Sequence, residues 1–209
     1  DGFVQEAVDS LQSIANQVAV AMQNIVSAET VAKRAQELET VAAISTATAT
    51  IMDTHDMLAT VVHLNQRRFG LYHAHVFMYN EDTKELQIEA CGYKEGDENE
   101  GTHGTASIPL AKKQSLVARA ARIRQPVIVN DVRNEPGWLP NPLLPDTQAE
   151  LAVPLIVGDK LLGVLDVQSD RINAFTEEDA NIQLTLASQV STSLQNARSF
   201  TVAQKQAER

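Results

Sequence analysis

The chain has 209 residues, of which 44% are hydrophobic and 21% are charged, enough to bury the core of one domain of about 150 to 170 residues. Seventeen Lys and Arg against 27 Asp and Glu leave a formal net charge of -10, so no basic surface is expected for nucleic acid or an anionic membrane. The single cysteine, Cys91, excludes an internal disulfide and a thiolate metal cage, and indicates a reducing interior.

The chain also lacks the sequence features of secretion and membrane insertion. No apolar run approaches about 18 residues, and the acidic start DGFVQEAVDS is no signal peptide. We therefore expect a cytoplasmic protein without membrane contact in this segment. Because the chain starts inside a repeated segment, as if cut from a longer protein, the presence of membrane segments elsewhere in that protein stays open.

A short repeat connects the two ends of the chain. Residues 15–24, ANQVAVAMQN, are closely similar to residues 187–196, ASQVSTSLQN. When Phe3 is aligned with Phe175, ten of 35 pairs are identical, at Phe3, Glu6, Ala15, Gln17, Val18, Gln23, Asn24, Ser27, Lys33 and Ala35. The spacing is far above the roughly 20 to 50 residues of a solenoid repeat, so it suggests a module of about 170 residues that ends in this segment.

One long helix is predicted from Phe3 to about Met52, because this stretch has no proline or glycine and is rich in Ala, Gln and Glu. Its apolar and small residues follow a spacing of alternating three and four positions, at Leu11, Ile14, Val18, Ala21, Ile25, Ala28, Ala32 and Ala35. This spacing predicts an intermolecular coiled coil. The alternative is an amphipathic helix that packs on its own domain.

The middle of the chain mixes helix and strand patterns. We first predict a helix capped by Asp53 or Thr54 and closed by Gly70, followed by strands at 73–80 and 86–92 and an acidic glycine-containing loop at 93–105. A short helix at 114–125 and a strand at 127–130 come next. A hairpin at 151–168 and a last helix from Glu177 to about Arg209 complete the chain. Within the hairpin, Gly158 and Asp159 suit the turn, Gly163 implies close approach of another backbone, and Pro154 implies an edge or a bulge.

Residues 132–149 form a long irregular segment with four prolines and the only tryptophan, Trp138. Its large apolar side chains argue against disorder, since they need something to cover. Two interpretations stay open. The segment is either a plug that seals the open side of the sheet or a lid over a ligand pocket.

Several motifs together resemble the GAF domains of bacterial signalling proteins. They are LAVPLIVGDKLLGVLDVQSD, AFTEEDA and LASQVSTSLQNAR, supported by QPVIVNDV and SLVARAA, and the resemblance covers about residues 38–200. It implies an α+β fold, an α/β/α sandwich with an antiparallel sheet of about six strands, long first and last helices bundled on one face, and loops and short helices on the other. Residues 1–37 would then be the tail of a preceding GAF repeat in a multi-sensor protein, and residues 201–209 the start of an output linker.

The known ligands of GAF domains can be checked against these residues. Bilin-binding members attach the chromophore through a pocket cysteine, commonly beside a histidine, whereas Cys91 here precedes Gly92 and Tyr93 at a strand end. Cyclic-nucleotide members carry an Asn-Lys pair after the last strand, where this chain has Ser169 and Asp170. The resemblance therefore supports neither a covalent bilin nor a cyclic nucleotide, and it identifies no cofactor.

We expect any small-molecule ligand to lie under the 132–149 segment and the dimer contacts to lie on the two end helices. The candidate ligand-binding residues are Tyr93, Arg122, Asp131, Trp138 and Leu143. The candidate dimer-interface residues are Leu11, Ile14, Val18, Ile25, Val190, Leu194 and Ala197.

Metal binding and anion binding receive weaker support from the sequence. His73 and His75 project from one face of a strand, but no further histidine or cysteine lies at a sequence spacing typical of metal ligands. We therefore predict no metal site, and a strand face that is solvated or hydrogen-bonded. Arg119, Arg122 and Arg124 crowd one short helix and could hold an anion, although ion pairs explain them more simply in this acidic chain.

Catalysis is not predicted either. The sequence has no G-x-S-x-G, no phosphate-binding glycine loop and no H-E-x-x-H motif. A free methionine sulfoxide reductase of GAF type would need cysteines in the pocket. We therefore expect no enzymatic activity in this chain, while an enzymatic output such as a histidine kinase would lie outside it.

Two hypotheses of function follow. In the first, a small molecule under the Trp138 segment changes how the long helices pack in a homodimer of a two-component sensor. In the second, the domain binds no ligand and relays strain from an upstream domain to an output such as a histidine kinase or a cyclase. An open pocket favours the first hypothesis, and a pocket filled by Trp138 and Leu143 favours the second.

Overall fold

The computed structural model describes residues 2–48, 53–92 and 107–207 of the chain. These residues belong to two compact units, Asp1–Thr40 and Val41–Arg209. Among the described helices, none is both long and apolar enough to cross a membrane. The loop predicted at 93–105 lies outside the described residues.

Helix α1, Gly2–Thr48, is one uninterrupted helix, as the absence of proline and of interior glycine predicts. In the single chain, Leu11, Ile14, Val18 and Ile25 are between 52% and 66% exposed. Its last turns, from Val41, belong to the second unit and contribute buried side chains to the core there.

The second unit is built on a six-stranded sheet. Its strands are β1 His73–Asn80, β2 Glu85–Gly92, β3 Ser107–Pro109, β4 Val127–Val129, β5 Ala149–Val157 and β6 Lys160–Ser169. They follow the order β3-β2-β1-β6-β5-β4, and every neighbouring pair is antiparallel. The predicted antiparallel sheet of about six strands is therefore confirmed.

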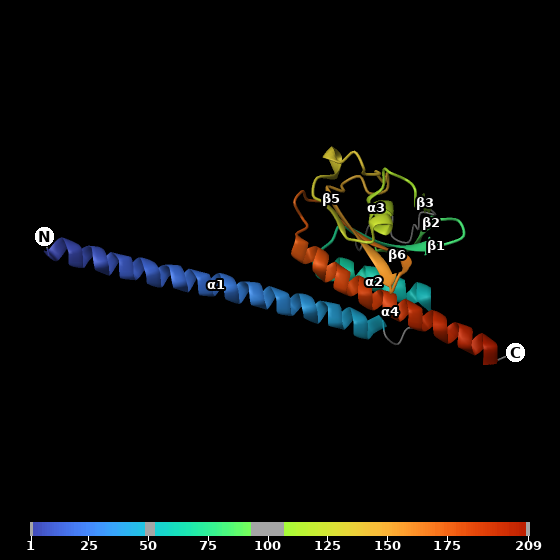
Figure 1. The fold of residues 1–209 in the computed structure, drawn as a ribbon, viewed down its shortest axis with the longest axis horizontal. Coiled ribbons are helices and arrows are strands. Elements are labelled where there is room, and N and C mark those ends of the chain that lie inside the picture. Colours follow the sequence, from blue (N-terminus) through green and yellow to red (C-terminus); the bar gives the residue numbers. More distant parts are fainter. Residues whose placement is uncertain (1, 49–52, 93–106, 208–209) are drawn as a thin grey trace. The chain divides into compact units, whose positions relative to one another are not determined.

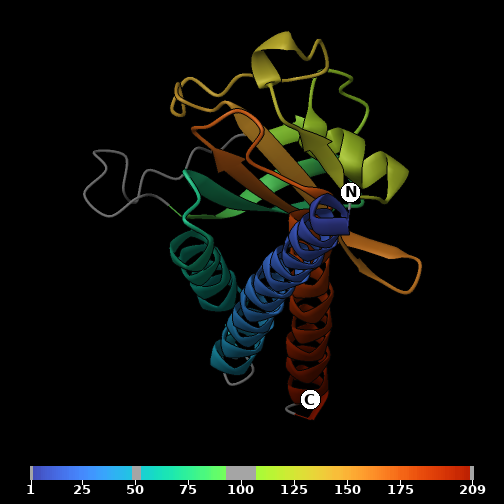
Figure 2. The same ribbon diagram turned by 90° about the vertical axis from the view of Figure 1, so that its left-hand side faces the viewer.

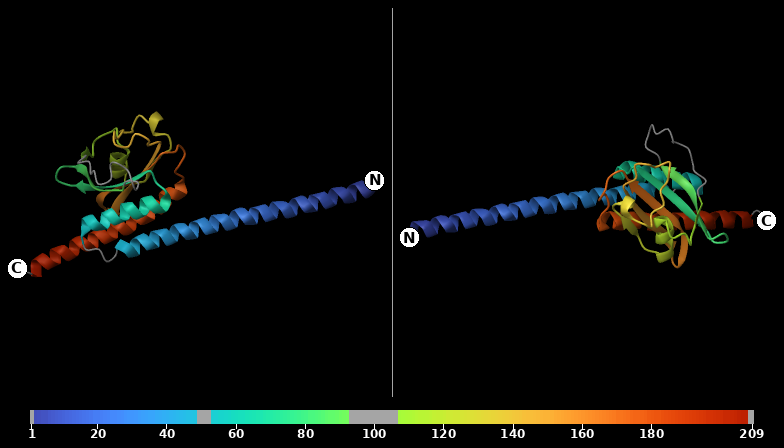
Figure 3. Two further views of the ribbon diagram at one scale, coloured as in Figure 1. Left: turned by 180° about the vertical axis from the view of Figure 1, so that it is seen from behind. Right: turned by 90° about the horizontal axis from the view of Figure 1, so that it is seen from above.

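Helices cover both faces of this sheet. Helices α2, Thr54–Phe69, and α4, Glu177–Ala207, lie side by side on one face, and α3, Leu116–Ile123, lies on the other (Figures 1 and 3). Figure 2 shows the irregular segment between β4 and β5, which includes the short helix η1, Val132–Asn134, on the face away from α2 and α4. The predicted α/β/α sandwich is confirmed.

Local sequence signals fix the ends of these helices. The Asp53 side chain accepts a hydrogen bond from the Asp56 amide, and Gly70 closes α2 in the left-handed conformation. At the start of α4, Thr176 and Asp179 accept hydrogen bonds from each other's backbone amides, which is the predicted capping box.

The hairpin of β5 and β6 also forms as predicted. Gly158 turns it with a φ of 57°, a conformation that glycine adopts without steric cost. A Cβ atom on Gly163 would collide with the carbonyl oxygen of Phe77 on β1, so this position requires glycine. Pro154 lies beyond the last pairing of β4 with β5 at Ala152, where β5 has become an edge.

The face under α2 and α4 holds a large apolar core. Val190 and Leu194 of α4 are 3% and 0% exposed and belong to this core. Their assignment to a dimer interface is therefore wrong, because the apolar stripe of α4 covers the domain's own sheet. Ala197, one turn further along, is partly exposed.

Candidate functional site

Polar side chains form a buried cluster on the sheet face opposite α2 and α4. Successive side chains of a strand point to opposite faces, so His73 and His75 of β1 share this face, as do Asp166 and Gln168 of β6. Pairing between the strands places His75 opposite Asp166, and His73 opposite Gln168. Glu150 of β5 pairs with Gln168 from the other side. All five are buried.

Hydrogen bonds connect the members of this cluster. Gln168 Nε2 donates to Asp166 Oδ2 over 2.8 Å, and the Thr147 hydroxyl donates to Gln168 Oε1 over 2.7 Å. His75 Nδ1 lies 3.4 Å from Asp166 Oδ2, and the Nε2 atoms of His73 and His75 are 2.9 Å apart. The cluster is thus a continuous network across β1 and β6.

Glu150 and Asp166 form an acidic pair inside this network. Trp138 Nε1 donates to Glu150 Oε2 over 2.9 Å, whereas Asp166 Oδ1 finds no hydrogen-bond partner among the described residues. Burial, and then the neighbouring charge of Asp166, raise the pKa of Glu150 well above its usual range.

Burial also determines the charge of two further groups. It lowers the pKa of His73 from 6.5 to about 2, with a smaller contribution from His75, so His73 is neutral. It raises the pKa of the Cys91 thiol from 9.0 to about 11. Cys91 lies on β2 directly opposite His75.

A cavity of about 240 Å³ opens beside the acidic pair. Its polar end consists of His75, Glu150, Asp166 and Gln168. The rest is mostly apolar and is lined by Phe77 and Ile88 of the sheet, Ile108 of β3, Leu116 and Val117 of α3, and Leu139, Pro140, Pro142 and Leu143 of the irregular segment, with Ser107, Ser115 and Asn141 completing it. This volume lies just below the roughly 300–1,000 Å³ of typical ligand pockets, so it suits a compact organic molecule.

Only some of the predicted ligand-binding residues lie at the cavity. Leu143 lines the cavity. Trp138 does not line it, but its indole donates a hydrogen bond to Glu150, which does. Arg122 and Asp131 do not line this cavity. The Arg122 guanidinium donates to the carbonyl oxygens of Leu110 and Lys112, and Asp131 accepts from Asn134 near η1. Tyr93 lies outside the described residues.

Of the two predicted alternatives for His73 and His75, a solvated or a hydrogen-bonded strand face, the structure shows the hydrogen-bonded one. Both side chains are hydrogen-bonded, and they are only 0% and 2% exposed, so they are withdrawn from the outer surface of the domain. The reason is that the segment before β5 covers this end of the sheet. Leu144 packs on Cys91, and the buried Thr147 bonds to Gln168.

Sequence patterns missed Glu150, Asp166 and Gln168. Each interrupts an apolar strand, in AELAVPLIV and KLLGVLDVQS, at a position where alternation demands an inward side chain. Charged residues in such strands are rarely buried without a partner or a function. That signal was present, but only the pairing of β5 with β6 shows that the side chains meet.

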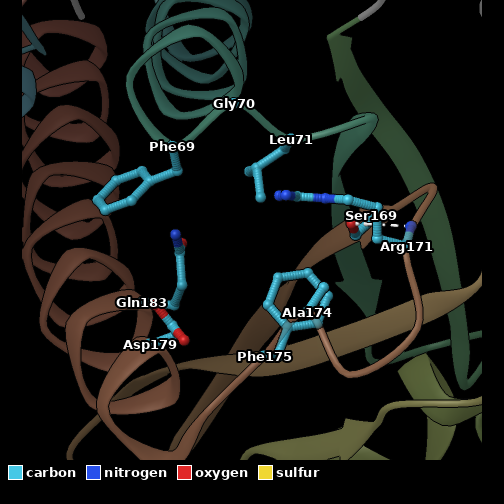
Figure 4. Close-up of a pocket in the computed structure, with 9 residues that line it drawn as sticks. All are labelled: Phe69, Gly70, Leu71, Ser169, Arg171, Ala174, Phe175, Asp179 and Gln183. Carbon is cyan, nitrogen blue, oxygen red and sulfur yellow. Dashed lines mark hydrogen bonds between the residues drawn. The ribbon is translucent and has the colours of Figure 1, made fainter.

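A second, much smaller pocket lies on the other side of the sheet, between the end of α2, the turn after β6 and the start of α4 (Figure 4). Its volume is about 60 Å³, enough for a few water molecules. Arg171 extends along it toward Leu71, and Phe175, Asp179 and Gln183 line it (Figure 4). The larger cavity is therefore the better candidate for a ligand.

The family model of the GAF domain matches residues 52–195. The chain belongs to the GAF domain family. GAF domains are sensory and regulatory signalling domains, and this much of the predicted role is confirmed. No curated protein matches the chain significantly in sequence.

Solved structures with the same fold come from several signalling and metabolic proteins. The GAF domain of a phosphoenolpyruvate-protein phosphotransferase from Coxiella burnetii is 20% identical, with a TM-score of 0.70 over 80% of this chain and 97% of that one. Residues 122 to 287 of a methyl-accepting chemotaxis protein are 18% identical, with a TM-score of 0.64 over 75% of this chain and 98% of that one.

A third similar structure is an enzyme. The free methionine-R-sulfoxide reductase from Neisseria meningitidis, solved in complex with its substrate, is 22% identical, with a TM-score of 0.69 over 80% of this chain and 93% of that one. We expected no enzymatic activity in this chain, and this finding corrects that expectation. The reductase has the same fold and is an enzyme, so a GAF fold does not by itself argue against catalysis. At this level of identity, the likeness establishes the fold alone.

Proposed function

We propose that this GAF domain is a sensor for a small molecule that binds in the cavity beneath residues 139–143. The ligand has an apolar body and a head that donates hydrogen bonds, such as an amine. The observation that carries this proposal is the acidic pair of Glu150 and Asp166 at the polar end of a mostly apolar cavity.

Charge supports this class of ligand. Asp166 Oδ1 has no donor among the described residues, and a buried acceptor without a donor costs roughly 1–3 kcal/mol. A ligand N–H group would supply that donor, and a cationic amine would also offset the negative charge of the pair. Among the described residues that line the cavity there is no lysine or arginine, which disfavours an anionic ligand.

The open cavity favours the sensor over a ligand-free relay domain. A relay domain is expected to fill this space with Trp138 and Leu143. Instead, Trp138 is bonded to Glu150 and Leu143 lies at the wall of the cavity. The reductase from Neisseria meningitidis, whose structure contains its substrate, gives a precedent for a small molecule held by a protein of this fold.

The route from cavity to output would pass through the sheet. Asp166 faces the cavity, whereas its neighbours Leu165 and Val167 face the core that includes Val190 and Leu194 of α4. A ligand that shifts β6 therefore changes the surface on which α4 packs. It can switch the protein only if it has different affinities for two such packings.

The wider context is part of the same proposal. The exposed stripe of α1, Leu11, Ile14, Val18 and Ile25, would form a coiled coil with a second copy, and the paired helices would connect a preceding GAF domain to an output such as a histidine kinase or a cyclase. Such a protein would be a homodimeric, cytoplasmic, bacterial sensor of a two-component system. The repeated end segments support this order of domains.

The test begins with the purified chain. We expect mass spectrometry of the denatured protein to release a small amine in stoichiometric amount, or a panel of free amines to raise the melting temperature. Asp166→Asn and Leu143→Trp should each weaken this binding at least tenfold, the first by removing the charge and the second by filling the cavity. Asp159→Asn, an exposed carboxylate in the turn between β5 and β6, is the matched control. Equal binding by Asp166→Asn and by the control would disprove the proposal.

A further inference from the structure

Two histidines and the only cysteine of the chain converge at the end of the polar cluster. His73 and His75 stand two residues apart on β1, and Cys91 stands on β2 directly opposite His75. One ligand atom from each of the three lies within 4.8 Å of the other two, and all three side chains are buried. From this geometry we propose that His73, His75 and Cys91 form a binding site for a divalent transition metal of zinc type.

The distances suit such an ion. The Nε2 atoms of His73 and His75 are 2.9 Å apart and face each other. Two imidazoles bound tetrahedrally to Zn²⁺ at about 2.0–2.1 Å have nitrogens about 3.3 Å apart. The metal therefore requires the rings to separate by only about 0.4 Å, which small rotations of the two side chains supply.

The donor set identifies the class of metal. Two imidazole nitrogens and one thiolate sulfur suit Zn²⁺ and its spectroscopic substitute Co²⁺, whereas Mg²⁺ and Ca²⁺ require oxygen ligands. Three protein ligands leave one coordination position. Because His75 also lines the cavity, that position is open to water or to a small molecule held there. A site with three protein ligands and one exchangeable ligand is typical of zinc centres that act on or sense small molecules.

A carboxylate behind one of the ligands supports the same assignment. His75 Nδ1 lies 3.4 Å from Asp166 Oδ2, and Asp166 is itself held by Gln168 Nε2 at 2.8 Å. In metal sites, such a carboxylate accepts the second ring N–H of a histidine and turns its Nε2 toward the metal. Here the same contact directs His75 Nε2 toward His73, where the metal would lie.

The competing explanation is a buried pair of histidines, hydrogen-bonded to each other, with Cys91 as an apolar neighbour. That explanation requires no metal affinity. It also predicts that replacing Cys91 with serine leaves every metal-dependent property of the protein unchanged.

The experiment is a Co²⁺ titration of the purified 209-residue chain, followed by visible and near-ultraviolet absorption. We expect one Co²⁺ per chain, with bands of a tetrahedral ion and a thiolate-to-cobalt charge-transfer band, and displacement of Co²⁺ by Zn²⁺. Cys91→Ser should abolish the charge-transfer band, and His73→Ala should lower the affinity at least tenfold. His63→Ala, an exposed histidine on α2, should change neither property.

Two outcomes overturn the proposal. One is the absence of tetrahedral cobalt bands in the wild-type chain, and the other is a charge-transfer band that survives in Cys91→Ser. Circular dichroism verifies that each variant is folded. If His73→Ala does not fold, the comparison of the wild-type chain with Cys91→Ser still tests the proposal. Saturating Zn²⁺ must raise the melting temperature of the wild-type chain, and it must raise that of folded Cys91→Ser by less.

Discussion

The indole Nε1 of Trp138 donates a hydrogen bond to Glu150 Oε2 over 2.9 Å, and this bond fastens the irregular segment between β4 and β5 to the sheet. Trp138 is half-buried and Glu150 is buried, so the carboxyl group has little access to water as an alternative partner. The same bond holds the wall of the cavity formed by residues 139–143 in place.

Removing this donor should destabilise the domain. We expect Trp138→Phe to lower the free energy of unfolding by about 1–3 kcal/mol, since it leaves a buried acceptor without its donor. Urea denaturation measures the change. In the background of Glu150→Ala, the same substitution should cost markedly less, because the acceptor is already absent. Equal costs in the two backgrounds would mean that packing of the ring, and not the hydrogen bond, accounts for the loss.

The pH dependence of the free energy of unfolding should reflect the protonation of the Glu150 carboxyl group. In the unfolded chain its pKa is near 4.5, and in the folded chain burial and Asp166 raise it well above that value. As pH rises above 4.5, the unfolded state releases a proton that the folded state still binds, so stability is lost until pH has passed the folded pKa.

Glu150→Gln should remove this loss. Its amide keeps an acceptor for Trp138 and offers a donor to Asp166 Oδ1, so at pH 8 we expect a gain on the order of 1–3 kcal/mol in the free energy of unfolding. Denaturation at intervals from about pH 5 to pH 8 gives the profile. Glu81→Gln, at an exposed carboxylate in the β1–β2 turn, should follow the wild-type profile. A Glu150→Gln profile parallel to wild type would contradict the assignment.

Gly163 should not tolerate a side chain. A Cβ atom there collides with the carbonyl oxygen of Phe77, which is backbone of the central strand β1 and cannot move without breaking its pairing with β6. We expect Gly163→Ala to destabilise the domain by about 2 kcal/mol or more. Gly158→Asn is the control, because a Cβ at Gly158 meets no atom within 4 Å and asparagine tolerates a positive φ. Thermal denaturation compares the two, and similar losses would refute the steric explanation.

The two copies of the repeated segment should respond differently to the same charge. Val18 of α1 is 52% exposed, so Val18→Glu should leave the domain folded and dissociate any coiled-coil dimer. Leu194 of α4 is fully buried in the core, so Leu194→Glu should unfold the domain at a cost of several kcal/mol. Sedimentation velocity and circular dichroism separate these effects. A wild-type chain that is monomeric at micromolar concentration would contradict the coiled coil.

The repeat also illustrates where sequence reasoning fails. Val18 and Val190 are equivalent in the alignment of the two segments, and both have the spacing of a helix seam. Yet the helix seam of α4 packs on the domain's own sheet, while Val18 is exposed. Periodicity identifies an apolar helix face but not the surface that covers it.

The sequence by itself determined the features that depend on neighbouring residues. The absence of proline and interior glycine gives α1, the side chains of Asp53, Thr176 and Asp179 start α2 and α4, and Gly158 turns the hairpin of β5 and β6. These signals act within a few residues through backbone geometry and short hydrogen bonds, so they are legible without a tertiary structure.

Only the tertiary structure decided which side chains meet. Glu150 and Asp166 are adjacent because β5 pairs with β6, and Cys91 joins His75 because β1 pairs with β2. Strand register fixes these contacts across long stretches of chain, and a shift of one residue would turn every side chain to the other face of the sheet. The candidate ligand and metal sites are therefore products of register, and no local pattern in the sequence specifies register.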